Sequence, residues 1–173
     1  MHASFTNSAK QPVTLDLVTS DGFEDWLSKQ TEAVSAFART TGFKGQAEQI
    51  LLSPNTEGGL SLAAYGMGDG VDAMMLAGAS ARLPEGDYKI GVMPEGLDAS
   101  ALYAGWADGA YRFERYKSSD KKTPRLLIEK GADIEAASRE ANAVDLVRDL
   151  INTPAQDMGP SQIEQAARDL AKA

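Results

Sequence analysis

The chain has 173 residues, of which 43% are hydrophobic and 24% are charged, and it contains no cysteine. Its length and composition are those of a globular domain, with or without an appendage, and the lack of cysteine excludes disulfides, a thiolate nucleophile and a zinc finger. A formal net charge of −8 argues against charge-driven binding to DNA or anionic lipid, since both need Lys and Arg to neutralise phosphates.

His2 is the one histidine of the sequence, and we expect it to lie in a frayed terminus. A Ser-His-Asp triad, a Cys-His dyad and a histidine-rich zinc site are therefore not expected. The first ten residues lack the apolar core of a signal peptide, and apolar runs elsewhere are far shorter than the roughly 18 residues that indicate a membrane span. These features predict a cytoplasmic protein without a membrane partner.

Residues 12–19 alternate between apolar and other side chains and predict the first strand. Asp21 is placed to cap a helix, with Glu24 three residues on as in a capping box, and Gly42 is placed to end that helix. The apolar stripe of the helix consists of Phe23, Trp26, Leu27, Val34 and Phe37. The chain is thus predicted to open with a strand and one helix.

The next part of the sequence predicts a hairpin, a turn, a helix and a strand. Residues 49–53 and 60–65 are strand-like, and the turn-forming residues between them predict an antiparallel hairpin. Residues 66–70 predict a glycine-rich turn before a short helix over 71–82 that is rich in Ala and Met. Residues 88–93 predict a compact strand that a Pro-Glu-Gly sequence ends.

A further helix is predicted over residues 100–116. Its apolar face at helical spacing consists of Leu102, Trp106, Gly109, Phe113 and Tyr116. A glycine inside a helix costs about 1 kcal/mol relative to alanine, so Gly105 and Gly109 indicate a close approach to a neighbouring element. A charged loop follows, and residues 125–129 predict a short strand that Gly131 bounds.

The last part of the sequence predicts two helices with no strand after them. The first covers residues 134–151 and should end near Asn152, because Thr153 precedes a proline and is pushed away from helical geometry. Its apolar side consists of Ala137, Ala141, Val144, Val147 and Ile151. Pro160 fits the first turn of the second helix. The apolar positions there are Ile163, Ala166, Ala167, Leu170 and Ala171, and this face has no evident partner.

Strands and helices alternate along most of the chain, which predicts the α/β class, with a mixed sheet flanked by helices. Three stretches then resemble the amino-terminal domain of the leucyl aminopeptidase (cytosol aminopeptidase) family of two-metal metallopeptidases. They are Tyr65-Gly66-Met67-Gly68, the segment from Gly109 to Ser118 with its Tyr-Arg-Phe-x-x-Tyr-Lys pattern, and the join from Asp149 to Pro160. Their order and spacing fit, so the resemblance spans nearly the whole chain. Gly159 replaces the family's usual Thr, and glycine is an acceptable N-cap.

The resemblance implies a macro-domain-like α/β domain over residues 1–131. Residues 132–173 are then a linker helix and the truncated start of a metallopeptidase catalytic domain. The full-length protein would release N-terminal amino acids from peptides with two divalent metal ions, zinc or manganese. The lysine and carboxylate ligands of these ions lie in the family's carboxy-terminal domain, beyond the end of this sequence. No residue here matches a catalytic, cofactor-binding or metal-binding motif, so none is assigned, and we expect the 173-residue chain alone to be inactive.

The resemblance also implies the partners. This part of the protein is expected to have a structural, oligomer-forming or regulatory role, to contact its own catalytic domain, and to belong to a hexamer when full length. Peptide substrate is expected in the missing domain. Nucleic acid is not an expected partner.

Glycines at 66–70 allow a different function, a stand-alone macro-domain-like module for an ADP-ribose-type ligand. Glycines let main-chain N–H groups approach a phosphate at a helix start. The dinucleotide fingerprint, however, needs glycine at the position of Val71, and Asp69 and Asp72 repel phosphate. We therefore favour a plain strand-to-helix turn.

Two charged clusters are the remaining candidates. A DNA-binding accessory domain is suggested by basic residues interleaved with aromatic ones, namely Arg112, Arg115, Lys117, Lys121, Lys122 and Arg125. We expect Phe113 and Tyr116 on the buried stripe of their helix, which leaves the basic groups as a solvated face. Local structure or an interface contact is therefore preferred to nucleic-acid binding. Asp145 and Asp149 lie one turn apart, as metal-binding carboxylates sometimes do. No histidine or third acid converges on them, so a solvated helix face is favoured.

Overall fold

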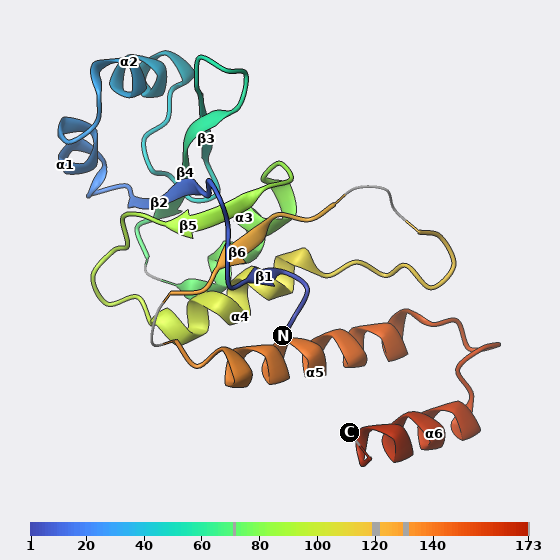
Figure 1. Ribbon diagram of the computed structural model, residues 1–173. Coiled ribbons are helices and arrows are strands. Elements are labelled where there is room, and N and C mark those ends of the chain that lie inside the picture. The colour runs from blue at the N-terminus through green and yellow to red at the C-terminus, as the bar shows by residue number, and fades with distance from the viewer. Residues whose placement is uncertain (71, 119–121, 130–131, 173) are drawn as a thin grey trace.

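One six-stranded sheet forms the centre of the fold, with the strand order β1-β6-β5-β2-β4-β3 (Figure 1). The strands are β1 (Phe5–Thr6), β2 (Val13–Thr19), β3 (Ile50–Pro54), β4 (Leu60–Gly68), β5 (Asp87–Ile90) and β6 (Arg125–Leu127). Neighbouring strands are parallel except β3 and β4, which pair antiparallel at one edge. The computed structural model describes residues 1–70, 72–118, 122–129 and 132–172. The predicted mixed sheet and hairpin are confirmed.

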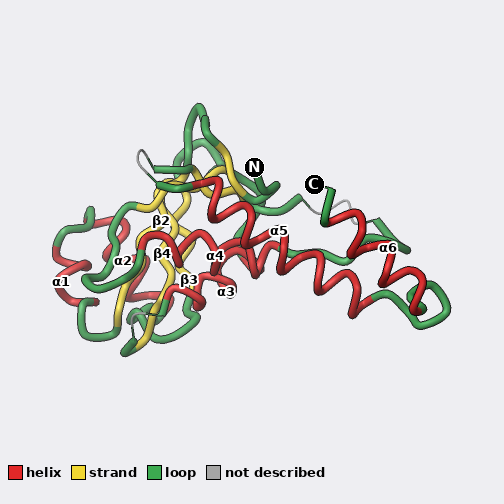
Figure 2. Tube along the Cα trace, turned by 90° about the horizontal axis from the view of Figure 1, so that it is seen from below, coloured by secondary structure: helices red, strands yellow, loops and turns green. Residues whose placement is uncertain are grey.

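Helices cover both faces of this sheet. They are α1 (Phe23–Ser28), α2 (Glu32–Thr41), the 3-10 helix η1 (Ala73–Met75), α3 (Leu76–Arg82), α4 (Ala99–Ala110), α5 (Ile134–Asn152) and α6 (Pro160–Leu170). Figure 2 shows the strands between α1 and α2 on one side and α3 and α4 on the other. α5 packs against α4, and α6 lies beyond α5, away from the sheet. We call β1–β6 with α1–α4 the α/β body, and α5 with α6 the helical arm.

The sheet separates two hydrophobic cores. The central strand β2 contributes to both, because successive residues of a strand face opposite sides of the sheet. Leu17 belongs to the core that contains Trp106 of α4. Val18 belongs to the core that contains Trp26 of α1. Asp16 is buried on this second side, where its carboxylate accepts the indole N–H of Trp26 (2.8 Å) and a main-chain N–H after β5 (2.9 Å). The body is thus a three-layer α/β fold of the predicted class.

The single helix predicted between Asp21 and Gly42 is wrong, because two helices form there. The Thr31 hydroxyl accepts a hydrogen bond from the N–H of Val34 (3.3 Å) and so begins α2 as a separate helix. Gly22 holds the N-cap position of α1, so Asp21 does not cap it. Gly42 ends α2 in the left-handed conformation (φ 72°), as predicted.

The glycine-rich turn predicted over 66–70 is wrong in its first half, because β4 continues to Gly68. Gly66 serves packing rather than a turn: a Cβ there would overlap the main-chain oxygen of Gln46. The helix predicted over 71–82 is the short η1 followed by α3, and Val71 lies outside the described residues. The segment is therefore a strand end packed against a neighbouring loop.

Two predicted strands are shorter than expected. The strand predicted over 88–93 ends at Ile90, and the strand predicted over 125–129 ends at Leu127. The predicted boundary glycine, Gly131, lies outside the described residues. Both strands still take the predicted places between helices.

The helix predicted to reach Tyr116 ends at Ala110. The Arg112 guanidinium donates a hydrogen bond to the main-chain oxygen of Gly109 (3.0 Å), which satisfies a terminal carbonyl of the helix without a further turn. Phe113 and Tyr116 are therefore not on a buried helical stripe, and Tyr116 is 53% exposed.

The two glycines of α4 mark a close approach, as predicted. A Cβ at Gly105 would overlap the main-chain oxygen of Ala73, and a Cβ at Gly109 would overlap that of Ala77. α4 thus packs on η1 and α3 at backbone distance.

Both helices of the arm form where the sequence predicts them. α5 ends at Asn152, and Thr153 is extended (φ −75°, ψ 123°) before its proline. Gly159 is the N-cap of α6, where its N–H donates to Gln162 Oε1 (3.1 Å), and Pro160 follows in the first turn.

Burial divides the predicted apolar stripe of α5 into two parts. Ala137 and Ala141 are buried in the core with α4, whereas Val147 is 53% and Ile151 75% exposed. α6 has no buried residue. Among the described residues, no helix has the length and apolarity that a membrane crossing requires.

Candidate functional site

Tyr111, directly after α4, ties the body to the last turns of α5. Its hydroxyl donates a hydrogen bond to Asp149 Oδ1 (2.7 Å) and accepts one from Asn152 Nδ2 (3.1 Å). The Arg148 guanidinium lies 5.2 Å from the centre of the Tyr111 ring and forms an ion pair with Asp108 of α4. The last turns of α5 are thereby tied to the end of α4.

A second contact involves the connector between α5 and α6. The Tyr116 hydroxyl donates a hydrogen bond to the Asp157 carboxylate, and Arg115 Nη1 donates to Thr153 Oγ1 (3.4 Å). Thr153 is buried, and its own hydroxyl donates to the main-chain oxygen of Asp149 (2.6 Å), which closes the end of α5. We call the residues of these two contacts, within 108–116 and 148–157, the junction.

Both tyrosines of the junction resist ionisation. Burial and then the hydrogen bond to Asp149 raise the pKa of Tyr111. The hydrogen bond to Asp157 and then burial raise the pKa of Tyr116. A phenolate beside a carboxylate is repelled, so both phenols remain hydrogen-bond donors to the arm.

The two most specific segments of the family resemblance meet in this junction. Tyr111 belongs to the Tyr-Arg-Phe-x-x-Tyr-Lys segment and contacts Asn152 of the Asn-Thr-Pro join, 41 positions away. The sequence presents the two segments as separate markers, and spacing alone gives no sign that they touch. The structure shows that both belong to one contact surface, which holds the arm to the body.

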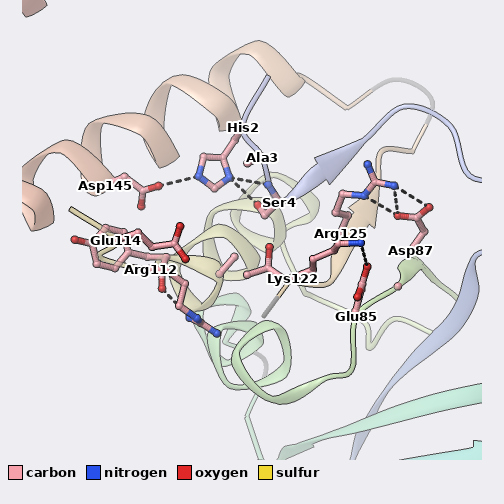
Figure 3. A pocket seen from close by; sticks show the side chains of 14 residues that line it. His2, Ala3, Ser4, Glu85, Asp87, Arg112, Glu114, Lys122, Arg125 and Asp145 are labelled. Atoms are coloured by element: carbon pink, nitrogen blue, oxygen red, sulfur yellow. Dashed lines mark hydrogen bonds and ion pairs between the residues drawn. The ribbon is translucent and has the colours of Figure 1, made fainter. Parts of the chain in front are cut away.

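His2 is not frayed, as the sequence suggested, but 7% exposed and bonded on every side. Its main-chain N–H donates to Ser138 Oγ (3.1 Å), Nε2 lies 2.9 Å from Asp145 Oδ2, and Nδ1 lies 2.7 Å from Ser4 Oγ (Figure 3). A Ser-His-Asp sequence of contacts is therefore present. Ser4 is only 1% exposed, so its hydroxyl cannot reach a substrate. The group anchors the N-terminal segment to α5.

A cavity of about 740 Å³ lies beside this anchor. Its walls come from the N-terminal segment, the start of β5, the end of α4, the segment before β6, and α5 (Figure 3). Arg125 forms a two-pronged pair with Asp87 (2.8 and 3.1 Å), and Lys122 pairs with Glu85 (3.1 Å). Most of the charge at this cavity is thus already neutralised by opposite charge.

The described residues of the predicted basic cluster are exposed, as expected, but they bind different groups. Lys122 and Arg125 line the cavity in ion pairs, whereas Arg115 bonds to the connector and Arg112 to main-chain carbonyls. Lys121 lies outside the described residues. Two of the aromatic residues interleaved with this cluster, Tyr111 and Tyr116, bind the arm.

Asp145 and Asp149, weighed as a metal pair, bind different protein groups. Asp145 contacts His2, and Asp149 accepts the Tyr111 hydroxyl. Over the residues that the structure describes, no group of three or more His, Cys, Asp or Glu side chains is placed to hold a metal ion. These carboxylates belong to the anchor and the junction.

An exposed apolar surface runs along the arm. Its large residues are Val144, Val147, Ile151, Ile163 and Leu170. A trough of about 590 Å³ between α5 and α6 is lined in part by Leu146, Leu150 and Ala166. Amphipathic helices with bare apolar faces are typical of interaction surfaces.

Comparison with known proteins places this architecture among aminopeptidases. The family model of the M17 aminopeptidase N-terminal domain matches residues 13–129. The sequence is 32% identical over 171 residues to a probable cytosol aminopeptidase of Leifsonia xyli subsp. xyli, covering 90% of this chain and 33% of that protein. It is 29% identical over 196 residues to a probable cytosol aminopeptidase of Wolinella succinogenes, with 99% and 38% covered.

A solved structure agrees with the sequence relatives. The cytosol aminopeptidase from Coxiella burnetii superposes with a TM-score of 0.84 and 26% identity, over 95% of this chain and 36% of that chain. The chain spans about a third of the length of the curated relatives it matches.

Proposed function

This chain belongs to the M17 aminopeptidase N-terminal domain family, and we propose that it is the non-catalytic amino-terminal part of a metal-dependent leucyl aminopeptidase. The full-length protein would release N-terminal amino acids from peptides. Its amino-terminal part, which this chain represents, would have a structural, oligomer-forming or regulatory role. Two findings support this proposal. The family model matches residues 13–129, and the chain is similar to two probable cytosol aminopeptidases.

The change in burial along α5 is the observation that carries the proposal. Ala141 is buried against the body, while Ile151 on the same stripe is 75% exposed. Apolar surface is stabilised by burial, and a contiguous bare patch marks a contact site. We infer that residues 1–131 form the amino-terminal domain. Residues 132–173 would then be the linker helix and the start of the catalytic domain, whose remainder covers the exposed face of the arm.

The metal chemistry is proposed for the catalytic domain alone. Two divalent ions, zinc or manganese, would activate a water and polarise the scissile carbonyl there. The described residues do not fit such a centre, since Asp145 and Asp149 are bound to His2 and Tyr111 and no third ligand joins them. No step of the hydrolysis is therefore assigned to this chain.

The proposed partners follow from the assignment of the chain to a leucyl aminopeptidase. They are the chain's own catalytic domain, the peptide substrate held by that domain, and further copies of the full-length protein in a hexamer. A cytoplasmic location is part of the proposal, and the description of the relatives as cytosol aminopeptidases supports it.

Activity measurements on two lengths of the protein test the proposal. The 173-residue chain and the full-length protein are each assayed on leucine p-nitroanilide with added manganese. We expect turnover by the full-length protein, loss of that turnover with a chelator, and none by the shorter chain. Metal-dependent turnover by the pure 173-residue chain would overturn the non-catalytic assignment, and an inactive full-length protein would overturn the peptidase assignment.

The two alternative functions gain no supporting contact. Gly66 packs against the main chain of Gln46, and this close packing explains the need for glycine there without a bound phosphate. Lys122 and Arg125 are already paired with carboxylates. Calorimetric titration with ADP-ribose and a gel shift across a salt series remain direct tests of the two alternatives, since real phosphate contacts weaken steeply with salt.

A further inference from the structure

The cavity beside His2 has walls that are fixed before any ligand arrives. Arg125 and Asp87 are locked together by two hydrogen bonds on one side (Figure 3). On the other side, Asp145 is held by His2, which is itself bonded to Ser4. Sites with such preorganised walls lose little conformational freedom on binding.

Among the described residues that line the cavity, Arg112 is a cation whose Nε and Nη2 groups bind no protein group. Its Nη1 donates to the main-chain oxygens of Gly109 (3.0 Å) and Tyr111 (2.7 Å), which uses both N–H groups of that nitrogen. Within the described residues, Arg112 has no carboxylate in an ion pair. The Nε and Nη2 edge is therefore available, and this edge binds a carboxylate through two parallel hydrogen bonds.

Asp145 supplies the opposite charge. Its Oδ2 faces His2 Nε2, and its Oδ1 has no protein partner in the part of the chain that the structure describes. The side chain is 27% exposed, so one oxygen can still accept from a bound ammonium group. Arg112 and Asp145 both line the cavity, and Figure 3 shows them on the same side of it.

The balance of charge narrows the ligand class. Among the described residues that line the cavity, the acidic ones are Glu85, Asp87, Glu114 and Asp145, and the basic ones are Arg112, Lys122 and Arg125. The groups that remain available for a ligand are one cationic edge, on Arg112, and one carboxylate oxygen, on Asp145. A ligand that carries both an anionic and a cationic group can bind both of them.

We propose that this cavity binds a small zwitterion, a free α-amino acid or a short peptide, with its carboxylate on Arg112 and its ammonium on Asp145. A volume of about 740 Å³ lies within the usual range of ligand sites. Binding does not depend on the proposed peptidase function. If that function holds, the ligand is the chemical class that the peptidase releases, and the site would report product to the amino-terminal domain.

A titration followed through the one histidine tests the proposal. His2 is the one histidine of this chain, so its two ring C–H protons are the only imidazole signals, and His2 contacts Asp145. L-leucine is added to the 173-residue protein without metal, and N-acetyl-leucine and leucinamide are added in parallel. We expect a saturable shift with leucine at a Kd on the order of 1 mM. Each analogue, which lacks one charge, should bind about tenfold more weakly or worse.

Variants assign the two ends of the ligand. Arg112→Gln and Asp145→Asn should each abolish the saturable shift, and Arg112→Lys should weaken it, because lysine keeps the charge but not the paired donors. Arg139→Gln, on an exposed part of α5, is the control and should bind like the parent. Thermal melts show that each variant is folded.

Two results would overturn the inference. One is the absence of a saturable shift with leucine in the parent protein. The other is equal binding of leucine and its two analogues, which does not need a folded variant to interpret. Because no metal or peptide turnover is involved, neither result depends on the outcome of the activity assay.

Discussion

The body and the arm both carry clear apolar patterns, but the body buries its pattern whereas the arm buries only the first half of α5. β2 alternates between two filled cores, whereas α6 has the full helical repeat and no buried residue. The contrast even falls within one helix, since Ala141 of α5 is buried and Ile151 is not. An apolar stripe therefore indicates that one face of an element can pack against a partner. It does not say whether that partner lies in the same stretch of chain.

The difference in burial between the two halves of α5 is tested most directly by placing the same charge on each half in turn. Ala141→Glu puts a carboxylate into the core with α4 and should lower the free energy of unfolding by about 3 kcal/mol or more. Val147→Glu lies on the exposed half and should change it by less than about 0.5 kcal/mol. Urea unfolding of both variants measures the difference. Similar losses would show that the arm is packed in solution.

A second prediction concerns the backbone contact inside the body. Gly109→Ala forces a Cβ against the main-chain oxygen of Ala77 and should cost about 1–3 kcal/mol, despite the better helix propensity of alanine. Gly70→Ala is the matched control, because a Cβ there meets nothing within 4 Å. Chemical denaturation measures the free energy of unfolding of both variants. An unchanged Gly109→Ala variant would mean that α4 does not approach η1 and α3 so closely.

A third prediction uses alkaline pH to probe a buried tyrosine of the body. Burial raises the pKa of Tyr88 from 10.0 to about 12. Above pH 10 the unfolded chain releases this proton while the folded chain retains it, so the folded state should lose stability as the pH rises from about 10 to about 12. Below pH 10 this contribution is constant. The loss is at most about 1.4 kcal/mol per pH unit.

Tyr88→Phe checks that assignment. This variant lacks the ionisable hydroxyl and should show a shallower decline of stability over the same pH interval, although it also loses the hydrogen bond to Pro84. An unaltered slope would assign the decline to other tyrosines, since burial also raises the pKa of Tyr65 and Tyr103.

The smallest predicted effect lies at the junction. Tyr111→Phe removes the hydrogen bonds to Asp149 and Asn152 and should cost about 1 kcal/mol or less in global stability. Its effect should instead be local, with faster hydrogen exchange in the connector around Thr153 and unchanged exchange in β2. Uniformly faster exchange throughout the chain would contradict the separation of body and arm.

Local patterns predicted much of the fold, and long-range contacts account for what they missed. The hairpin and the end of α5 at Asn152 follow from turn residues and from Pro154. The place of His2 does not, because its partners Ser138 and Asp145 lie 136 and 143 positions away. The break at Thr31 did have a local signal, since Thr is a strong N-cap residue, but the continuous apolar stripe concealed it.

The candidate site was the least predictable part. Residues such as Arg112 and Tyr116 were visible as a basic and aromatic segment, but the expected helix placed them wrongly. α4 stops at Ala110, where Arg112 donates to the carbonyl of Gly109, and Tyr111 and Tyr116 beyond its end bind the arm. No period in the sequence distinguishes a helix that ends there from one that continues.

By itself, the sequence determined the α/β class, the two helices of the arm and the family resemblance, since these depend on periodicity, turn chemistry and short motifs. Only the tertiary structure decided which half of the α5 stripe is buried, that the two marker segments meet, and that His2 is an anchor beside a charged cavity. The physical reason is the range of the interactions. A repeat specifies which side of an element is apolar, whereas burial and side-chain pairing depend on distant residues that folding brings into contact.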